Sequence, residues 1–343
     1  RLAKETSATA VYFTRGYEPH ATALEAALST ALQRQGIGCH RFPGHLLNEP
    51  EALSTKSGGP FKVFTPYWRT AQATLQLDLA GPAPDRLMSP DAWPTSDALE
   101  AWGLQPSSPD WTAGFSIWQP GEAGAASRLA AFVEGGLAHY AEGRDIPSAP
   151  AVSRLSPHLH FGEIGPRQVW AAVSEGEMRR PSLSRCADKF RAELGWREFS
   201  HALLYQRPDL ETANFKSAFD RFPWRDDPAG LRAWQQGRTG YPMVDAGMRE
   251  LWATGWMHNR VRMIVASFLV KDLRVSWLEG ARWFWDTLVD ADGLERVQDL
   301  FERAGENHSH GKDRLYPYEG SRHPGGVCGD GSLGAIGWIG PRK

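Results

Sequence analysis

The chain has 343 residues, of which 41% are hydrophobic, and its formal net charge is −2. This length allows one large core or two domains. A charge so close to neutral excludes binding of nucleic acid by overall positive charge, although a local basic patch would serve instead. No apolar run is long enough to span a bilayer, no secretory signal is visible, and the three cysteines lack metal-ligand spacing. We therefore expect a cytoplasmic chain without a metal site.

The first part of the chain alternates strand and helix patterns. Residues 8–13 predict a β-strand, a helical pattern runs over 20–35 and stops before Gly36, and residues 38–42 predict a second short strand. One helix between two strands is only part of an α/β sheet and is too small for an independent domain. Residues 1–70 are therefore expected to be a partial α/β domain, shortened at its start.

The following segment is rich in Pro, Gly and Ser and shows little periodicity. It is interrupted by an aromatic stretch at 61–68, and the part from 71 to 120 is expected to connect two domains. From Gly121 onwards the hydrophobic period is helical. Helices are predicted over residues 122–142, 166–175, 182–206, 231–236, 245–254, 259–271 and 277–289.

Polar side chains open the predicted helix at 259–271. Asn259 suits an N-cap or first-turn position, and Arg260 and Arg262 leave the first turn in different directions. Two guanidinium groups and an amide at a helix start favour an anionic or hydrogen-bonding ligand. A buried amphipathic helix whose arginines extend to solvent explains the local pattern as well.

Two earlier segments carry polar groups at regular spacing. Glu193 and Arg197 lie one helical turn apart and share a face with Trp196, an arrangement that also fits a surface ion pair beside a core tryptophan. The hydroxyl groups of Ser153 and Ser156, with the neighbouring backbone amides, are suited to hold a phosphate.

In their order along the chain, these segments resemble the DNA photolyase/cryptochrome family. The most specific matches are segments 153–156, 193–199, 239–246, 255–263 and 268–273. The resemblance implies an α/β plus all-α fold, with a partial α/β antenna domain (1–70), an interdomain connector (71–120) and an incomplete helical FAD-binding domain (121–292). Residues 293–343 depart from the family pattern and are expected to form a divergent, disordered tail.

The resemblance also implies a site for FAD. Arg262 would face the isoalloxazine ring and pair with Asp290, because a cation there stabilises the reduced, anionic flavin. The implied cofactor-binding residues are Tyr140, Ser153, Leu155, Ser156, Glu193, Arg197, Asn259, Arg262, Asp290 and Asp292. An antenna pigment of the folate or deazaflavin type occurs in the family, but Glu18 alone matches an antenna contact here.

The implied activity is that of a deoxyribodipyrimidine photo-lyase: light-dependent repair of cyclobutane pyrimidine dimers by a monomer that binds DNA. Glu193 would hydrogen-bond the flipped-out dimer, because the lesion cannot be reached inside the duplex. Trp196 would stack on the dimer and Met263 would pack beside it. Asn259 would contact both the flavin and the lesion.

Two further groups of residues have implied roles. Arg144 and Arg260 would hold DNA phosphates, which positions the strand without reading its sequence; for Arg144 a solvated surface is the alternative. The family reduces its flavin through three tryptophans, and Trp224 and Trp277 match the outermost and the middle one.

The segment that follows Asp292 departs from the family. Arg296 stands where a flavin-facing Asn is expected, and the innermost tryptophan cannot be placed. Two alternatives to repair therefore stay open: a cryptochrome-type flavin photoreceptor without repair activity, and an inactive photolyase fragment. Preference for dimer-containing DNA and retention of FAD would separate the three.

Overall fold

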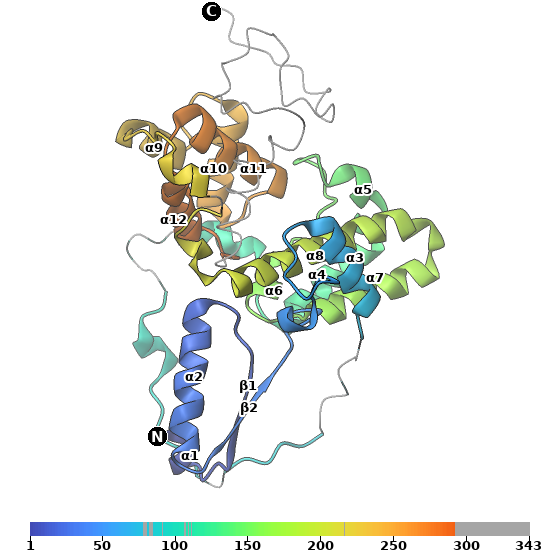
Figure 1. Cartoon of the computed structure of the whole chain (residues 1–343), viewed down its shortest axis with the longest axis vertical. Coiled ribbons are helices and arrows are strands. Elements are labelled where there is room, and N and C mark those ends of the chain that lie inside the picture. The colour runs from blue at the N-terminus through green and yellow to red at the C-terminus, as the bar shows by residue number, and fades with distance from the viewer. Residues whose placement is uncertain are drawn as a thin grey trace, which may run out of the picture.

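A computed structural model describes residues 1–291 except 78–80, 82–84, 91, 106–107, 109, 111 and 216. Figure 1 shows a small α/β unit at one end of the molecule and two groups of helices at the other. Within the part of the chain so described, no helix has the length and apolar character needed to cross a membrane.

The α/β unit consists of α1 (Leu2–Glu5), β1 (Ala10–Thr14), α2 (Pro19–Gln33) and β2 (Gly38–Phe42). The two strands pair in parallel, with Ala10 opposite Gly38 and Thr14 opposite Phe42. Pro19 begins α2, where its missing N–H is not needed, and Gly36 beyond the helix has a φ of 70°. The predicted order of strand, helix and strand is confirmed.

The aromatic stretch between the two parts of the chain forms a helix that the periodicity did not predict. This helix is α3 (Phe64–Thr74), which follows the short 3₁₀ turn η1 (Pro50–Ala52) and crosses the expected boundary at residue 70. Its Tyr67 and Ala71 pack in one hydrophobic cluster with Phe199 of the long helix α8 (Ser184–Gln206). Helix α3 therefore fastens the N-terminal part to the helical part.

The helical part has two cores. The first, around Phe132, Leu137 and Phe190, is formed mainly by α8 and the elements before it. These elements are α4 (Glu122–Glu134), η4 (Gly136–His139), α5 (Tyr140–Gly143), α6 (Ser156–His160), α7 (Pro166–Arg179) and η5 (Pro181–Leu183). The 3₁₀ turns η2 (Leu99–Trp102) and η3 (Thr112–Ile117) precede them in the chain. This core contains Phe190 and Leu194 of α8, and its group of helices lies beside the second group (Figure 1).

The second core surrounds the fully buried Trp234 and Met248. Its elements are α9 (Pro228–Gln235), α10 (Pro242–Thr254), α11 (Asn259–Ser267), the π-helical turn η8 (Phe268–Leu273) and α12 (Trp277–Thr287). The 3₁₀ turns η6 (Pro208–Glu211) and η7 (Ser217–Arg221) lie between α8 and α9 in the chain. The predicted helix starts at 259 and 277 are confirmed.

One helix prediction was wrong, because the chain is not a single continuous helix there. The pattern over 122–142 predicts a single helix, but the chain forms α4, η4 and α5 in succession. Gly135 and Gly136 separate α4 from η4, and a Cβ on Gly136 would lie 2.9 Å from the Phe132 ring. Because two adjacent glycines lower helix propensity and allow this close approach, the chain turns and α5 faces α8.

Candidate functional site

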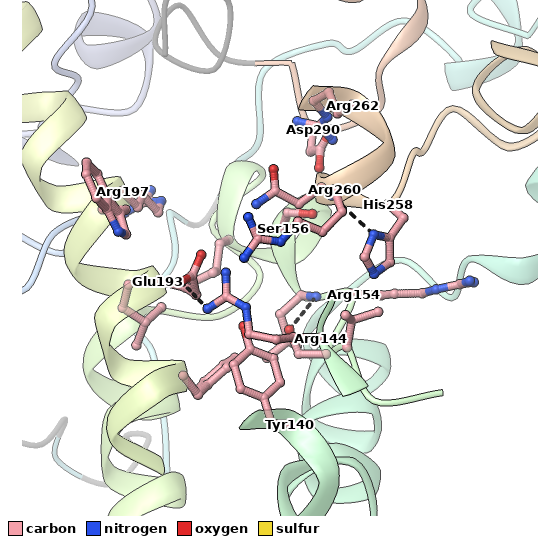
Figure 2. Close-up of a pocket in the computed structure, with 18 of the residues that line it drawn as sticks. Tyr140, Arg144, Arg154, Ser156, Glu193, Arg197, His258, Arg260, Arg262 and Asp290 are labelled. Carbon is pink, nitrogen blue, oxygen red and sulfur yellow. Dashed lines mark hydrogen bonds and ion pairs between the residues drawn. The ribbon is translucent and has the colours of Figure 1, made fainter. Parts of the chain in front are cut away.

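A cavity of about 570 Å³ lies between the two groups of helices and has the size of a ligand site. Figure 2 shows that its side chains come from α5, the turn before α6, α8 and the start of α11. The sequence-predicted site residues that line it are Tyr140, Arg144, Ser153, Leu155, Ser156, Glu193, Trp196, Arg197, Asn259, Arg260, Arg262, Met263 and Asp290. Trp224 and Trp277 lie elsewhere, and Asp292 is outside the described residues.

The serine-rich turn forms one wall of the cavity. Ser153 Oγ accepts a hydrogen bond from the backbone N–H of Leu155 at 3.4 Å, which folds the turn before Ser156 begins α6. Arg154 adopts a left-handed backbone with a φ of 53°, and its guanidinium lies 4.4 Å from the centre of the Trp256 ring. A cation over an aromatic face is attractive and fixes a strained backbone residue in place. Sequence reasoning missed both Arg154 and Trp256 as cavity residues.

A sharp turn aims the start of α11 at the cavity. Gly255 ends α10 with a φ of 69°, a conformation that favours glycine. Helix α11 is then capped by His258, whose Nδ1 accepts a hydrogen bond from the Arg260 N–H at 3.2 Å. Burial, with nearby Arg260, lowers the pKa of His258, so the ring is neutral and able to accept. Asn259 is therefore the first helical residue, the first-turn position among the two predicted for it.

A buried ion pair lies at one end of the cavity. The Nη2 of Arg262 is 3.6 Å from the Oδ1 of Asp290, and their side chains are only 7% and 1% exposed. Among the described residues, no donor hydrogen-bonds either carboxylate oxygen of Asp290. A buried carboxylate with unused acceptor capacity beside a cation is expected to receive donors from a ligand. The polar edge of a flavin ring offers a partner of this kind, so these residues fit FAD.

A second ion pair faces the first across the cavity (Figure 2). Arg144, at the end of α5, donates from Nη1 to the Oε1 of Glu193 on α8. The Arg144 side chain is 14% exposed, which rules out the solvated surface that was its alternative. Its guanidinium also lies 5.5 Å from the centre of the Tyr140 ring. Arg144 and Glu193 are therefore held together before any ligand binds.

Arg197 and Trp196 have partners from the N-terminal part of the chain. Arg197 Nη1 donates to the His45 carbonyl oxygen at 2.7 Å, and its Nη2 lies 2.6 Å from the His45 Nε2. Burial and the Arg197 charge lower the pKa of His45 to about 3, so its ring nitrogen is free to accept. Trp196 stacks on Phe64 with ring centres 3.8 Å apart. Their contacts with the cofactor and the lesion stay predictions.

Trp224 and Trp277 belong to the second hydrophobic core. Trp277 is 4% exposed, and its Nε1 donates to the Oδ1 of Asn214 at 2.9 Å. Trp224 is partly buried against the same cluster. The structure thus brings both into one apolar region, and their part in electron transfer stays a prediction.

Comparison with known families matches both parts of the chain. Residues 190–306 match the FAD binding domain of DNA photolyase, and residues 1–86 match the DNA photolyase family. The deoxyribodipyrimidine photo-lyase of Agrobacterium fabrum is 48% identical over 292 residues, 85% of this chain and 60% of that protein. Cryptochrome-2 of Arabidopsis thaliana is 39% identical over 302 residues, 84% of this chain and 48% of that protein. The chain therefore spans about three fifths or less of these relatives.

Solved structures show the same relationship. A bacterial class III photolyase from Agrobacterium tumefaciens superposes with a TM-score of 0.83 at 48% identity, over 87% of this chain and 62% of that chain. A cryptochrome from Synechocystis superposes with a TM-score of 0.72 at 26% identity, over 92% of this chain and 65% of that chain. The expected α/β segment followed by a helical FAD-binding domain is thereby confirmed. The chain belongs to the DNA photolyase/cryptochrome family.

Proposed function

We propose that this chain carries the site for light-driven splitting of cyclobutane pyrimidine dimers in DNA. One observation carries the proposal: a single cavity holds the Arg262–Asp290 pair at one end, and the pair of Arg144 from the end of α5 with Glu193 on α8 faces it. The first pair suits a flavin ring, and the second offers a carboxylate and a cation to a substrate. The 48% identity with a deoxyribodipyrimidine photo-lyase supports this assignment.

The cofactor-holding residues are those already placed around the cavity. Arg262 and Asp290 would hold the polar edge of the flavin ring, and the Ser153 and Ser156 hydroxyls would hold the phosphates. Tyr140, which is 6% exposed and packs edge-on against Phe190, closes the wall below them. Bound reduced FAD supplies the electron that, after light absorption, enters the dimer.

Glu193 and its neighbours would act on the lesion. The Glu193 carboxyl group hydrogen-bonds the flipped pyrimidines and stabilises the charge that develops on them as the two bonds joining the bases break. Met263 and the Trp196 ring supply apolar surface beside the dimer, and the Asn259 amide donates from the start of α11. Splitting of the dimer involves no net oxidation or reduction.

The test has two steps. The protein is incubated with FAD, separated from free cofactor and examined by visible absorption; we expect a structured flavin band near one equivalent per chain. The flavin is then reduced and the protein illuminated with an oligonucleotide that carries one thymine dimer. We expect light-dependent restoration of two thymines, and about a hundredfold slower repair by Glu193→Ala. A chain that keeps FAD yet repairs nothing in light would refute the proposal.

A second candidate, a flavin photoreceptor without repair, is favoured by the similarity to cryptochrome-2 of Arabidopsis thaliana. A comparison of binding to dimer-containing and undamaged DNA, added to that experiment, separates the two, because a photoreceptor would retain FAD and bind both DNAs equally well. Failure to retain FAD would instead indicate an inactive fragment. These outcomes differ in flavin content, in binding preference and in repair.

A further inference from the structure

One carboxylate near the cavity mouth bridges two arginines that come from distant parts of the chain. The Oδ1 of Asp145 is 2.6 Å from the Nε of Arg260 and 3.6 Å from the Nε of Arg144. Asp145 follows α5, whereas Arg260 lies in the first turn of α11, 115 residues further on. The bridge therefore joins the two groups of helices at the edge of the cavity.

The Nη1 atom of each arginine reaches a residue proposed to contact the lesion. Arg144 Nη1 is bonded to Glu193, and Arg260 Nη1 lies 3.8 Å from the Sδ of Met263. A guanidinium group is planar and rigid, so a contact at Nε fixes the directions of its terminal nitrogens. The hydrogen bond to Asp145 thereby sets the orientation of the Arg260 fork beside Met263, and the longer ion pair holds Arg144 near the same carboxylate.

We propose that Asp145 is a positioning residue for lesion recognition, which aligns the two phosphate-binding arginines with the residues that contact the dimer. This inference rests on the proposed function. An acidic group by itself repels DNA phosphates, so Asp145 is expected to oppose binding of undamaged DNA. Its benefit lies in geometry, because the correct separation of the arginines matters only when a flipped dimer occupies the cavity.

A purely structural ion pair is the competing explanation, and exposure argues against it. The side chains of Asp145 and Arg260 are 42% and 35% exposed. Ion pairs at such exposure contribute little to the free energy of unfolding, since solvent screens them. Asp145→Asn is therefore expected to leave the melting temperature nearly unchanged and to change DNA discrimination.

The test compares Asp145→Asn with wild type and with Glu142→Gln. Glu142 is the matched control, because it lies on α5, is 61% exposed and pairs with Arg185 at 2.5 Å. Dissociation constants are measured for one duplex with and without a thymine dimer, at several salt concentrations. For Asp145→Asn we expect affinity for undamaged DNA to stay equal or rise, while the preference for the dimer falls roughly fivefold to tenfold. Glu142→Gln should keep the wild-type preference, and Asp145→Glu should recover part of it.

Three other outcomes would overturn the inference. Equal weakening of both complexes with a lowered melting temperature would assign Asp145 a structural role and overturn the inference. An unchanged preference in Asp145→Asn would overturn it too. A wild-type chain that shows no preference would refute the proposed repair function itself, and the inference would fall with it.

Discussion

At the scale of single residues, the Arg262–Asp290 pair places two charged groups almost completely out of water. Burying two charges is costly, and their mutual attraction offsets that cost only while both are present. Among the described residues, both carboxylate oxygens of Asp290 also keep acceptor capacity that a ligand can use. The pair is therefore expected to influence folding as well as cofactor retention.

Asp290→Asn is predicted to destabilise the FAD-free protein, because the buried guanidinium of Arg262 loses its carboxylate partner. The expected loss is about 3 kcal/mol in the free energy of unfolding, measured by urea denaturation. The matched control is Glu279→Gln on α12, where the Glu279–Arg282 pair is exposed and its loss should cost less than about 1 kcal/mol. Equal stability of Asp290→Asn and wild type would contradict this view of the pair.

Single residues also show which features of the site the sequence predicts. Helical spacing predicted that Glu193 and Arg197 share a face, and both line the cavity. It did not predict that Arg197 bonds to His45, because a partner 152 residues away leaves no local pattern. Nor did it identify His258 as the cap of α11, since Asn259 beside it is the more usual capping residue.

At the scale of elements, part of the expected connector packs against the site. Turn η3 lies so close to the end of α10 that a Cβ on Gly114 would come within 1.6 Å of the Ala253 carbonyl oxygen. Trp118 Nε1 donates to the Thr254 carbonyl oxygen at 2.8 Å, and Gly255 in turn accepts from the Val289 N–H at 2.8 Å. The turn that precedes α11 is thus held by both hydrogen bonds, and the second of them also holds Val289, the residue before Asp290.

Gly114→Ala is predicted to push η3 away from α10, because the added methyl group would overlap backbone that cannot move independently. The expected cost is about 1 to 3 kcal/mol in the free energy of unfolding, accompanied by weaker FAD retention. Gly81→Ala is the control, since a Cβ at that connector position would meet no atom of the described residues within 4 Å. If both variants keep FAD equally well, the connector has no part in shaping the site.

The connector also shows why contacts between distant elements cannot be predicted from local sequence. Its abundance of Pro and Gly predicts a segment with little regular structure. The close approach at Gly114, however, depends on the position of α10, more than a hundred residues later. Likewise, the hydrophobic period predicts a helix from residue 259 onwards but not the π-helical turn at Phe268–Leu273 within it.

At the scale of the whole molecule, Glu198 joins the N-terminal part to the helical part. This residue of α8 is 1% exposed and accepts hydrogen bonds from the backbone N–H groups of Leu47 at 2.8 Å and Asn48 at 3.0 Å. Its neighbours include Arg197, whose Nη1 is 3.8 Å from the Glu198 Oε1, and the negative Glu49. The order of domains was predictable from sequence motifs, whereas this buried carboxyl group between them was not.

Glu198 predicts a pH dependence of stability, because burial raises its pKa to about 7 from an ordinary value of 4.5. The folded state then binds the proton more tightly, so this stabilisation is complete below pH 4.5 and is lost as pH rises to about 7, by about 3 kcal/mol. The lowered pKa values of His45 and His201 act in the opposite direction, since they cost stability as pH falls. Both histidines persist in Glu198→Gln, so the difference between wild type and this variant isolates Glu198.

Urea denaturation at pH 5 to 8 should show wild type losing stability relative to Glu198→Gln as the pH rises. The control Glu175→Gln, at a side chain that is 63% exposed, should follow wild type throughout. Parallel curves for wild type and Glu198→Gln would mean that the carboxyl group titrates near its ordinary pKa and does not link the two parts through its charge.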